Sequence, residues 1–449
     1  QELKQNFYLC FYNFIMMIEE APTPKFENKV VLNLSNPKVM GKIKDLNNNY
    51  LYWDKIKYKK INDFTPNEIW STVKLVRSIN YKQITFSNTV FNYFNTDYIQ
   101  KSLHEFDMNI GGYIGSQNII PESDKARYLV SSIMEEAISS SIMEGANTTR
   151  KKAKDMLRKD TKPINKSEQM IVNNYLTIKH ILKNKNDQLT PENLLQIHKL
   201  MCSNTLTNKN EEGAFRTSND IHVVNYSTSE VVHTPPDFTK TNQLIKELCV
   251  FFNSEKEDFI HPIVKGIIIH FMIGWIHPFT DGNGRTARAL FYWYLLKKGY
   301  WLTEYLSISK IIQGSKNQYE KAYLYTENDA NDLSYFITYH IEVMHKAFES
   351  LKNYIQEKQK ENLQIASFIK IPGINERQAQ ILKTIFNEPE CVFSVKEVQN
   401  RFSIANYTAR TDLNNLVNMG YMEMISVNKV KQNYVRSVNF SNLIQKTNL

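Results

Sequence analysis

The 449-residue chain has few cysteines and few residues that break regular structure. Its four cysteines are scattered and form no C-x-x-C pair, which argues against a disulfide framework and against a zinc knuckle. We therefore expect a reducing, cytoplasmic setting. With only 14 glycines and 13 prolines, a collagen-like or linker-dominated chain is excluded.

Long apolar runs are also absent. The two longest, residues 7–18 and 266–276, fall short of the roughly 20 residues that a membrane-spanning helix requires. Only one lysine precedes the first run, and two glutamates follow it where a signal peptide needs small residues. We therefore expect no membrane contact, and we interpret residues 7–18 as structural or as extra sequence upstream of the true start.

The composition that remains is that of a globular protein. Hydrophobic residues make up 42% of the chain and aromatic residues 12%, which excludes wholesale disorder. The length is enough for about three domains. The net charge of +9 favours acidic partners, but this modest excess does not resemble the dense basic stripe of a dedicated nucleic-acid-binding protein.

Periodicity divides the chain into four parts. Residues 1–120 form an N-terminal region in which no pattern reveals a chemistry. Residues 121–350 show apolar positions every three or four residues, which predicts a helical domain, and the alternating stretch 213–238 within it predicts a hairpin or flap. Residues 351–372 predict a helical extension and linker. The last part, 373–440, has the element order of a winged helix.

Successive helical patterns fill the second and fourth parts. The expected helices span residues 126–138, 167–183, 190–203, 239–253, 263–276, 285–298, 377–386, 395–402 and 407–419, and the expected strands span 421–427 and 433–438. Ser167, Thr190 and Thr239 stand at the start of three of these helices, where a hydroxyl can accept a backbone N–H. Pro262 suits the first turn of another.

One segment between two apolar helices, from His277 to Arg288, has a histidine, an aspartate, two glycines and two arginines within twelve residues. Pro278 is expected to end the first helix and to present His277 to the loop. Gly282 and Gly284 let backbone N–H groups converge where the second helix begins, and the dipole of that helix favours an anion there. The loop therefore predicts an anion cradle.

Charged side chains complete this cradle. Arg285 and Arg288 are neighbours on the first helical turn and can reach phosphate oxygens. Asp281 offers the carboxylate that Mg²⁺ takes together with phosphates and water. A histidine, with an ordinary pKa of about 6.5, can take a proton from an attacking hydroxyl. The loop predicts phosphate-centred group transfer. A plain helix–helix turn with a core histidine is the competing interpretation.

The segment matches at every position the signature H-P-F-x-[DE]-G-N-G-R-x-x-R, so the chain resembles the Fic-domain proteins. Residues 213–216 resemble that family's G-x-[FY]-R segment, and residues 222–236 lie where the family has its target-docking flap. The resemblance covers about residues 121–350. It implies a mainly α fold: a Fic-type helical core with a short β-hairpin flap, followed here by the winged-helix domain.

The resemblance implies that the chain is a protein adenylyltransferase, which transfers AMP from ATP to a Ser, Thr or Tyr hydroxyl of a target protein with Mg²⁺. It makes His277 the general base, Asp281 the Mg²⁺ ligand and Phe279 the anchor of the loop in the core. The residues that it assigns to the nucleotide phosphates are Gly282, Asn283, Gly284, Arg285 and Arg288. Gly284 matters because the kinase-like members of the family carry lysine there.

A second short motif implies inhibition. Ser140, Glu144 and Gly145 match the family's inhibitory [ST]-x-x-x-E-[GN] motif, at the end of an expected inhibitory helix near 124–145. The resemblance implies that Glu144 pairs with Arg288 and takes the place of the γ-phosphate. An ordinary helix C-terminus would also explain these residues.

Two other functions stay open. The chain could remove AMP, with Glu144 orienting a water molecule, or act as a DNA-binding regulator whose Fic core senses nucleotide. The expected recognition helix 407–419 has few cations, so contact with DNA through the winged helix should be modest in affinity, and contact with a protein is an equal alternative. A homodimer is an option by analogy with the family.

Overall fold

The structure is a computed structural model that describes most of the chain. The described residues are 18–61, 63–111, 125–224, 231–255, 259–426 and 432–446. Most of the apolar run at residues 7–18, the middle of the flap and part of the wing hairpin lie outside these ranges. The described residues are mostly helical, as predicted, and no helix among them is long and apolar enough to cross a bilayer.

The chain divides into two compact units, which we call unit 1 and unit 2. Unit 1 comprises the described parts of residues 1–111, 180–301 and 311–345. Unit 2 comprises the described parts of residues 112–179, 302–310 and 346–449. The N-terminal region and the helices around the candidate loop therefore fold together in unit 1.

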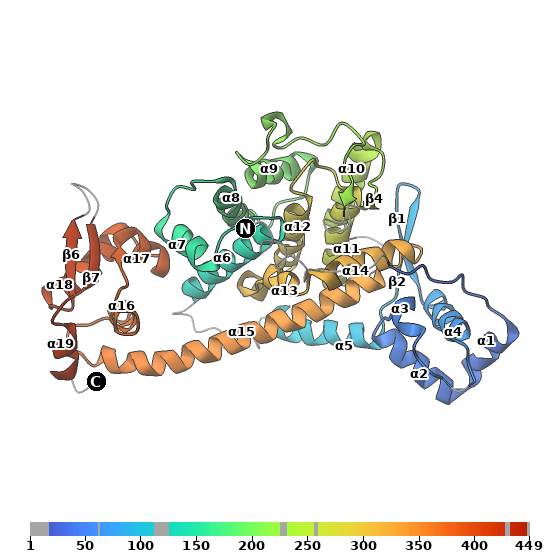
Figure 1. The fold of residues 1–449 in the computed structure, drawn as a ribbon, viewed down its shortest axis with the longest axis horizontal. Helices are drawn as coiled ribbons and strands as arrows, with labels where there is room; N and C mark the ends of the chain where they lie inside the picture. Colours follow the sequence, from blue (N-terminus) through green and yellow to red (C-terminus); the bar gives the residue numbers. More distant parts are fainter. Residues whose placement is uncertain are drawn as a thin grey trace, which may run out of the picture. The chain divides into compact units, whose positions relative to one another are not determined.

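Four helices form the centre of unit 1. They are α9 (Pro191–Cys202), α10 (Thr241–Asn253), α11 (Pro262–Ile276) and α12 (Asn283–Lys297). Helix α11 is apolar on all sides and nearly all of it is buried, as expected for a helix enclosed by others. Helices α11 and α12 lie side by side along most of their length, and α9 and α10 cover them (Figure 1). The predicted candidate loop connects α11 to α12.

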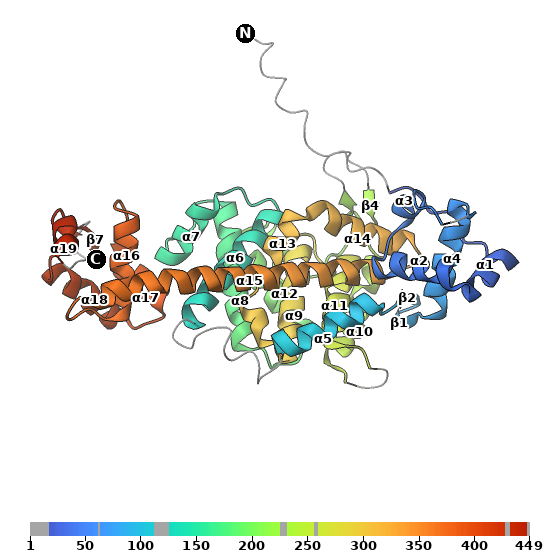
Figure 2. The same cartoon turned by 90° about the horizontal axis from the view of Figure 1, so that it is seen from below.

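The N-terminal region adds a helical cluster and a hairpin to unit 1 (Figure 2). Its elements are α1 (Asn28–Leu32), η1 (Asn33–Ser35), α2 (Pro37–Asn48), α3 (Trp53–Ile56), α4 (Pro66–Ile79), β1 (Lys82–Phe86), β2 (Thr89–Tyr93), α5 (Asp97–Phe106) and η2 (Asp107–Gly111). Buried charges join it to the rest of the unit: the Nζ atom of Lys74 donates to Asp329 at 2.8 Å, and Nη1 of Arg77 donates to the Tyr335 hydroxyl at 2.6 Å. The region that the sequence left without a role thus supports the end of α14 and the start of α15.

The remaining elements of unit 1 lie between α9 and α15. They are η4 (Lys209–Glu211), β3 (Val223–Val224), β4 (Val231–His233), η5 (Phe238–Lys240), the greater part of α13 (Ile308–Gly314), α14 (Lys316–Asn328) and the first part of α15 (Ser334–Ile369). Strands β3 and β4 pair in the antiparallel sense with a register shift, as the sequence predicts for a hairpin flap. Residues 225–230, in the middle of the flap, lie outside the described part.

Unit 2 contains the helix of the second motif and the winged helix. Its elements are α6 (Lys125–Met143), α7 (Arg150–Lys159), most of α8 (Lys166–Lys183), most of η6 (Trp301–Tyr305), the rest of α15, α16 (Glu376–Asn387), β5 (Phe393–Ser394), α17 (Val395–Phe402), α18 (Asn406–Asn418), β6 (Met422–Ser426), β7 (Gln432–Arg436) and α19 (Phe440–Lys446). Strands β5, β7 and β6 form one antiparallel sheet in that order. Three helices and this sheet confirm the predicted winged helix.

The winged helix packs on α6 and α7 within unit 2. Helix α17 provides the contact: the Nδ2 atom of Asn400 donates to the Arg158 carbonyl at 2.7 Å, and Nζ of Lys396 lies 3.2 Å from the Asp160 carboxylate. The domain is therefore joined to the rest of unit 2 by packing as well as by the long helix α15.

The helix ends agree closely with the sequence, but two of the three expected caps are wrong. Thr190 caps α9 by accepting from the Asn193 N–H at 3.2 Å. Helix α8 begins earlier than expected, so Asn165 takes the place of Ser167 as its cap. Helix α10 has no side-chain cap, because Asp237 instead caps the short 3₁₀ turn η5 that leads into it.

Candidate active site

His277 ends α11 and opens the loop. It has φ +48° and ψ +57°, a left-handed conformation that is uncommon for a residue with a Cβ atom. Its Nδ1 lies 3.1 Å from the Gly274 carbonyl oxygen. A carbonyl only accepts hydrogen bonds, so Nδ1 carries the proton and a neutral ring has its lone pair on Nε2. The helix end thus sets the tautomer that a general base needs.

The loop closes on itself through one side chain. Asn283 accepts from the Phe279 N–H at 3.0 Å and donates to the Phe279 carbonyl at 2.8 Å, and Asn283 is almost fully buried. The side chain of Asn283 therefore shapes the loop from inside. The Thr280 hydroxyl donates to Glu211 at 2.8 Å and ties the outer side of the loop to the turn η4.

Arg216 anchors the backbone on both sides of His277. Its N–H donates to the Pro278 carbonyl at 2.8 Å, and its Nε donates to the His277 carbonyl at 2.9 Å. Its Nη1 donates to the Ser218 carbonyl at 2.9 Å, and its Nη2 donates to the Pro236 carbonyl. This buried guanidinium gives the segment at residues 213–216 a physical role, because it joins the loop to the base of the flap.

Helix α9 forms the floor of the loop. The ring of His198 stacks on Phe279 with 3.7 Å between centroids and an angle of 1° between the planes. His198 also contacts the carbonyl of Asp281 and the amide of Gly213. Burial lowers the pKa of His198 to about 4, so the ring is neutral at neutral pH. Phe279 is fully buried, consistent with the anchoring role expected of it.

Gly282 comes so close to α9 that a side chain has no room. It has φ +85°, and a Cβ atom there would lie 2.6 Å from the Cys202 sulfur. Gly299 has nearly the same φ, +87°, but nothing lies within 4 Å of the corresponding position. The two glycines share a backbone conformation and differ only in their surroundings.

We expect Gly282→Ala to destabilise unit 1 more than Gly299→Ala. Alanine at Gly299 should cost about 1 kcal/mol for the left-handed backbone. The same change at Gly282 should cost about 2–4 kcal/mol, because the crowding against Cys202 adds to the backbone term. Thermal unfolding of the two variants measures the difference. Equal melting temperatures would show that the loop can move away from α9 at no cost.

Both arginines of the candidate segment lie on α12 and are buried. The side chain of Arg285 is fully buried; Nη1 donates to the Met201 carbonyl at 3.2 Å, and Nη2 lies 3.4 Å from Oδ1 of Asp281. Arg288 follows one turn later on α12 and is also buried. Asp281 has a half-exposed side chain.

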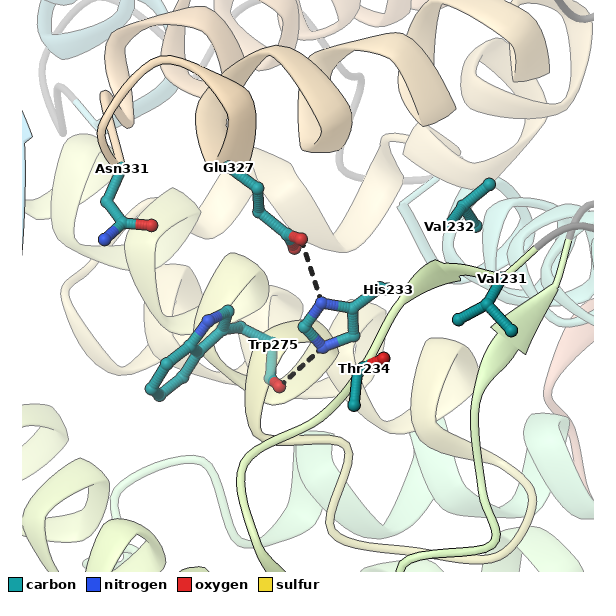
Figure 3. Close-up of a pocket in the computed structure, with 7 residues that line it drawn as sticks. All are labelled: Val231, Val232, His233, Thr234, Trp275, Glu327 and Asn331. Carbon is teal, nitrogen blue, oxygen red and sulfur yellow. Dashed lines mark hydrogen bonds and ion pairs between the residues drawn. The ribbon is translucent and has the colours of Figure 1, made fainter. Parts of the chain in front are cut away.

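A pocket lies beside the flap, where one histidine holds strand β4 against the rest of unit 1 (Figure 3). Nδ1 of His233 is 2.9 Å from the Glu327 carboxylate, and Nε2 is 2.9 Å from the Trp275 carbonyl. These two bonds tie the ring of His233 to α14 and to α11. Val231, Val232, Thr234 and Asn331 complete the lining of the pocket. Through its bond to the Trp275 carbonyl, His233 thus ties the flap to α11 at a point two residues before His277.

The second motif lies at the end of α6 in unit 2. Ser140 is buried, Glu144 is exposed, and Gly145 has φ +91°, the usual conformation of a glycine that terminates a helix. Glu144 donates its backbone N–H to the Ser141 carbonyl at 3.1 Å. The local geometry satisfies a helix C-terminus, and the pairing of Glu144 with Arg288 stays a prediction.

Comparison with known proteins agrees with this geometry. A model of the Fic/DOC family matches residues 188–295, which include α9 to α11, most of α12, the loop, His198 and Arg216. The chain carries a Fic domain. A model of the DeoR-like helix-turn-helix domain matches residues 377–425, which cover α16 to α18 and most of β6. The two predicted domain types are therefore confirmed.

Two curated proteins that match part of the chain are named protein adenylyltransferases. The chain is 33% identical over 119 residues to the protein adenylyltransferase Fic of Aedes aegypti, and 28% identical over 120 residues to protein adenylyltransferase fic-1 of Caenorhabditis elegans. Each match covers about a quarter of this chain and 22% of the relative. The chain thus matches only about a fifth of the length of these relatives.

A solved structure is similar to a larger part of the chain. It is that of a Fic domain containing signaling protein from Bacteroides thetaiotaomicron, with 19% sequence identity and a TM-score of 0.47. The match covers 57% of this chain and 96% of that protein.

Proposed function

We propose that the chain is a protein adenylyltransferase that transfers AMP from ATP to a Ser, Thr or Tyr hydroxyl of a target protein. The observation that carries this proposal is the state of His277. His277 stands at the start of the glycine loop. Its Nδ1 is bound to the Gly274 carbonyl, which leaves Nε2 as the basic nitrogen. A base beside an anion cradle is suited to phosphoryl-centred transfer to a hydroxyl.

In this mechanism the loop and the start of α12 bind the phosphates of ATP. The oxygen of the target hydroxyl bonds to the α-phosphorus, while the bond from that phosphorus to the oxygen that bridges to the β-phosphate breaks. Pyrophosphate leaves with the bonding electrons, and the hydroxyl proton passes to Nε2 of His277. Backbone N–H groups from Gly282 to Gly284 and the dipole of α12 stabilise the charge on the phosphates, and Arg288 is the proposed contact of the γ-phosphate.

Mg²⁺ is the cofactor that this proposal includes, and Asp281 is suited to hold it. The side chain of Asp281 is 46% exposed, and its bonds from the Gly282 N–H and from Arg285 both go to Oδ1. Mg²⁺ commonly uses one or two protein carboxylates and takes its other ligands from phosphates and water. When bound, the ion would neutralise phosphate charge.

We further propose that Glu144 inhibits the reaction by pairing with Arg288 in the place of the γ-phosphate. Support comes from the motif and from the exposure of the Glu144 side chain at the end of α6. Removal of AMP from a modified target, with Glu144 orienting water, is the alternative for the same residues.

The winged helix is proposed to contact DNA through α18. Tyr407 is 81% exposed, and Arg410, Thr411 and Asn414 lie on the same exposed face, where such side chains can read base edges. Binding of the full chain to duplex DNA that weakens steeply with salt would support this contact. No binding to duplex DNA at low salt would remove this contact and leave a protein partner as the alternative.

ATP labelled at the α- or the γ-phosphate tests the main proposal. The chain is incubated with each label and separated from free nucleotide, first alone and then with a lysate. We expect covalent label from α-labelled ATP and none from γ-labelled ATP, because the transfer leaves the γ-phosphate in pyrophosphate. Label from γ-labelled ATP would show a kinase, and release of label from a modified target would show removal of AMP.

A further inference from the structure

His198 makes three contacts with the candidate loop and its support. Its ring stacks on Phe279, 3.7 Å between centroids. Its Nε2 lies 2.9 Å from the Asp281 carbonyl oxygen, and its Nδ1 lies 3.1 Å from the Gly213 amide nitrogen. These contacts join α9, the loop and the segment that begins at Gly213.

The partners of His198 set its protonation. The Gly213 N–H only donates, so Nδ1 accepts; the Asp281 carbonyl only accepts, so Nε2–H donates. One neutral tautomer satisfies both bonds. The side chain is fully buried under the loop and cannot touch a substrate, so a role in proton transfer is excluded.

The loop is pressed against α9 at this point. The position of a Cβ atom on Gly282 lies 2.6 Å from the Cys202 sulfur and 3.3 Å from Nε2 of His198. The Asp281 carbonyl is therefore held at a fixed distance from α9. The backbone N–H groups of Gly282 to Gly284 follow it in the chain and are positioned with it. A shift of about 1 Å in such a cradle can cost about 10²-fold in rate.

We propose that His198 is a positioning residue: it holds the backbone of the glycine loop of the Fic domain in the position that phosphate transfer requires. The kinetic part of this inference rests on the proposed function, whereas the structural part does not. Sequence inspection offers no sign of it, because His198 lies 83 positions before the residue that it holds.

Three variants separate the contacts. His198→Phe keeps a ring against Phe279 and removes the hydrogen bonds to Asp281 and Gly213, together with the contact of Nε2 with the Cys202 sulfur. His198→Gln keeps an amide that can donate to the Asp281 carbonyl and removes the ring. His345→Phe is the matched control, because His345 also packs against a phenylalanine, with 4.4 Å between its ring and that of Phe106, and its Nε2 is hydrogen-bonded to the Ser102 hydroxyl at 3.0 Å.

Amide hydrogen exchange of the peptide that covers the loop tests the structural part without any reaction. We expect exchange at residues 279–284 to quicken by about 10-fold or more in His198→Phe, since an anchored loop opens through local fluctuations. His198→Gln should fall between this variant and the unchanged chain, and His345→Phe should exchange as the unchanged chain does. Unchanged exchange in folded His198→Phe and His198→Gln would overturn the proposal.

AMP transfer tests the kinetic part. We expect kcat per folded molecule to fall by about 10- to 100-fold in His198→Phe, with little change in the KM for the target, and to recover in part in His198→Gln. An unchanged kcat in the presence of faster loop exchange would overturn the kinetic part. If no variant transfers AMP, including the unchanged chain, the proposed function fails, while the exchange result still decides the role of His198.

Discussion

Replacing His277 by alanine is expected to lower the rate of AMP transfer by about 10²- to 10⁴-fold, the usual contribution of a general base. The reason is that Nε2 is the nitrogen with the lone pair once Nδ1 donates to the Gly274 carbonyl. The measurement is incorporation of α-labelled AMP under single-turnover conditions, so that product release does not hide the effect.

Folding should be little affected by His277→Ala, because His277 is partly exposed and water can replace its bond to Gly274. The melting temperature and the hydrogen exchange of α11 serve as controls. His277→Gln, which cannot take up a proton, should be as slow as the alanine variant. A rate within about threefold of the unchanged chain would remove His277 from the reaction and with it the proposed mechanism.

Replacing Glu144 by glycine is expected to raise the rate of self-modification by about 100-fold. If the carboxylate favours the blocked state by about 2.7 kcal/mol, only about one molecule in a hundred is competent to bind ATP productively, and removing the carboxylate releases the rest. The exposed position of Glu144 at the end of α6 makes a loss of folding from this change small. The measurement is the initial rate of α-label incorporation.

A double-mutant cycle with Arg288→Ala decides whether Glu144 acts through that arginine. Removal of the carboxylate should raise the rate in the unchanged chain and have little effect when Arg288 is already gone, because the pair then no longer exists. Glu144→Gln keeps the shape of the side chain without its charge and should also raise the rate. Equal stimulation in both backgrounds would place the action of Glu144 elsewhere, and no stimulation in either would refute the inhibitory pairing.

The parts of the site that the sequence predicts are the local ones. The end of the first helix before Pro278 follows from neighbouring residues, and so does the second helix, which is predicted from residue 285 and begins at Asn283. The winged helix was recognisable for the same reason, since its three helices and two of its strands are each marked by short patterns.

The parts that the sequence does not predict depend on contacts between distant residues. His198 looks like any histidine on an amphipathic helix, and the burial of Arg285 against the Met201 carbonyl becomes visible only when α9 and α12 are packed. Lys74 and Arg77 stand in the N-terminal region, where the sequence indicates no chemistry, yet both are buried against the α14–α15 turn. Charge patterns carry little information about such burial, because a paired charge and a solvated one look alike in sequence.

The packing of α17 on α7 has a consequence for truncation studies. A chain shortened before Glu376 would keep every residue of the glycine loop, yet it would uncover one side of α7 and leave the Arg158 carbonyl without its donor on Asn400. Helix α6, which ends just before Glu144, also packs on α17. Deleting the C-terminal domain to isolate the Fic domain would thus loosen the helix that carries the proposed inhibitory residue.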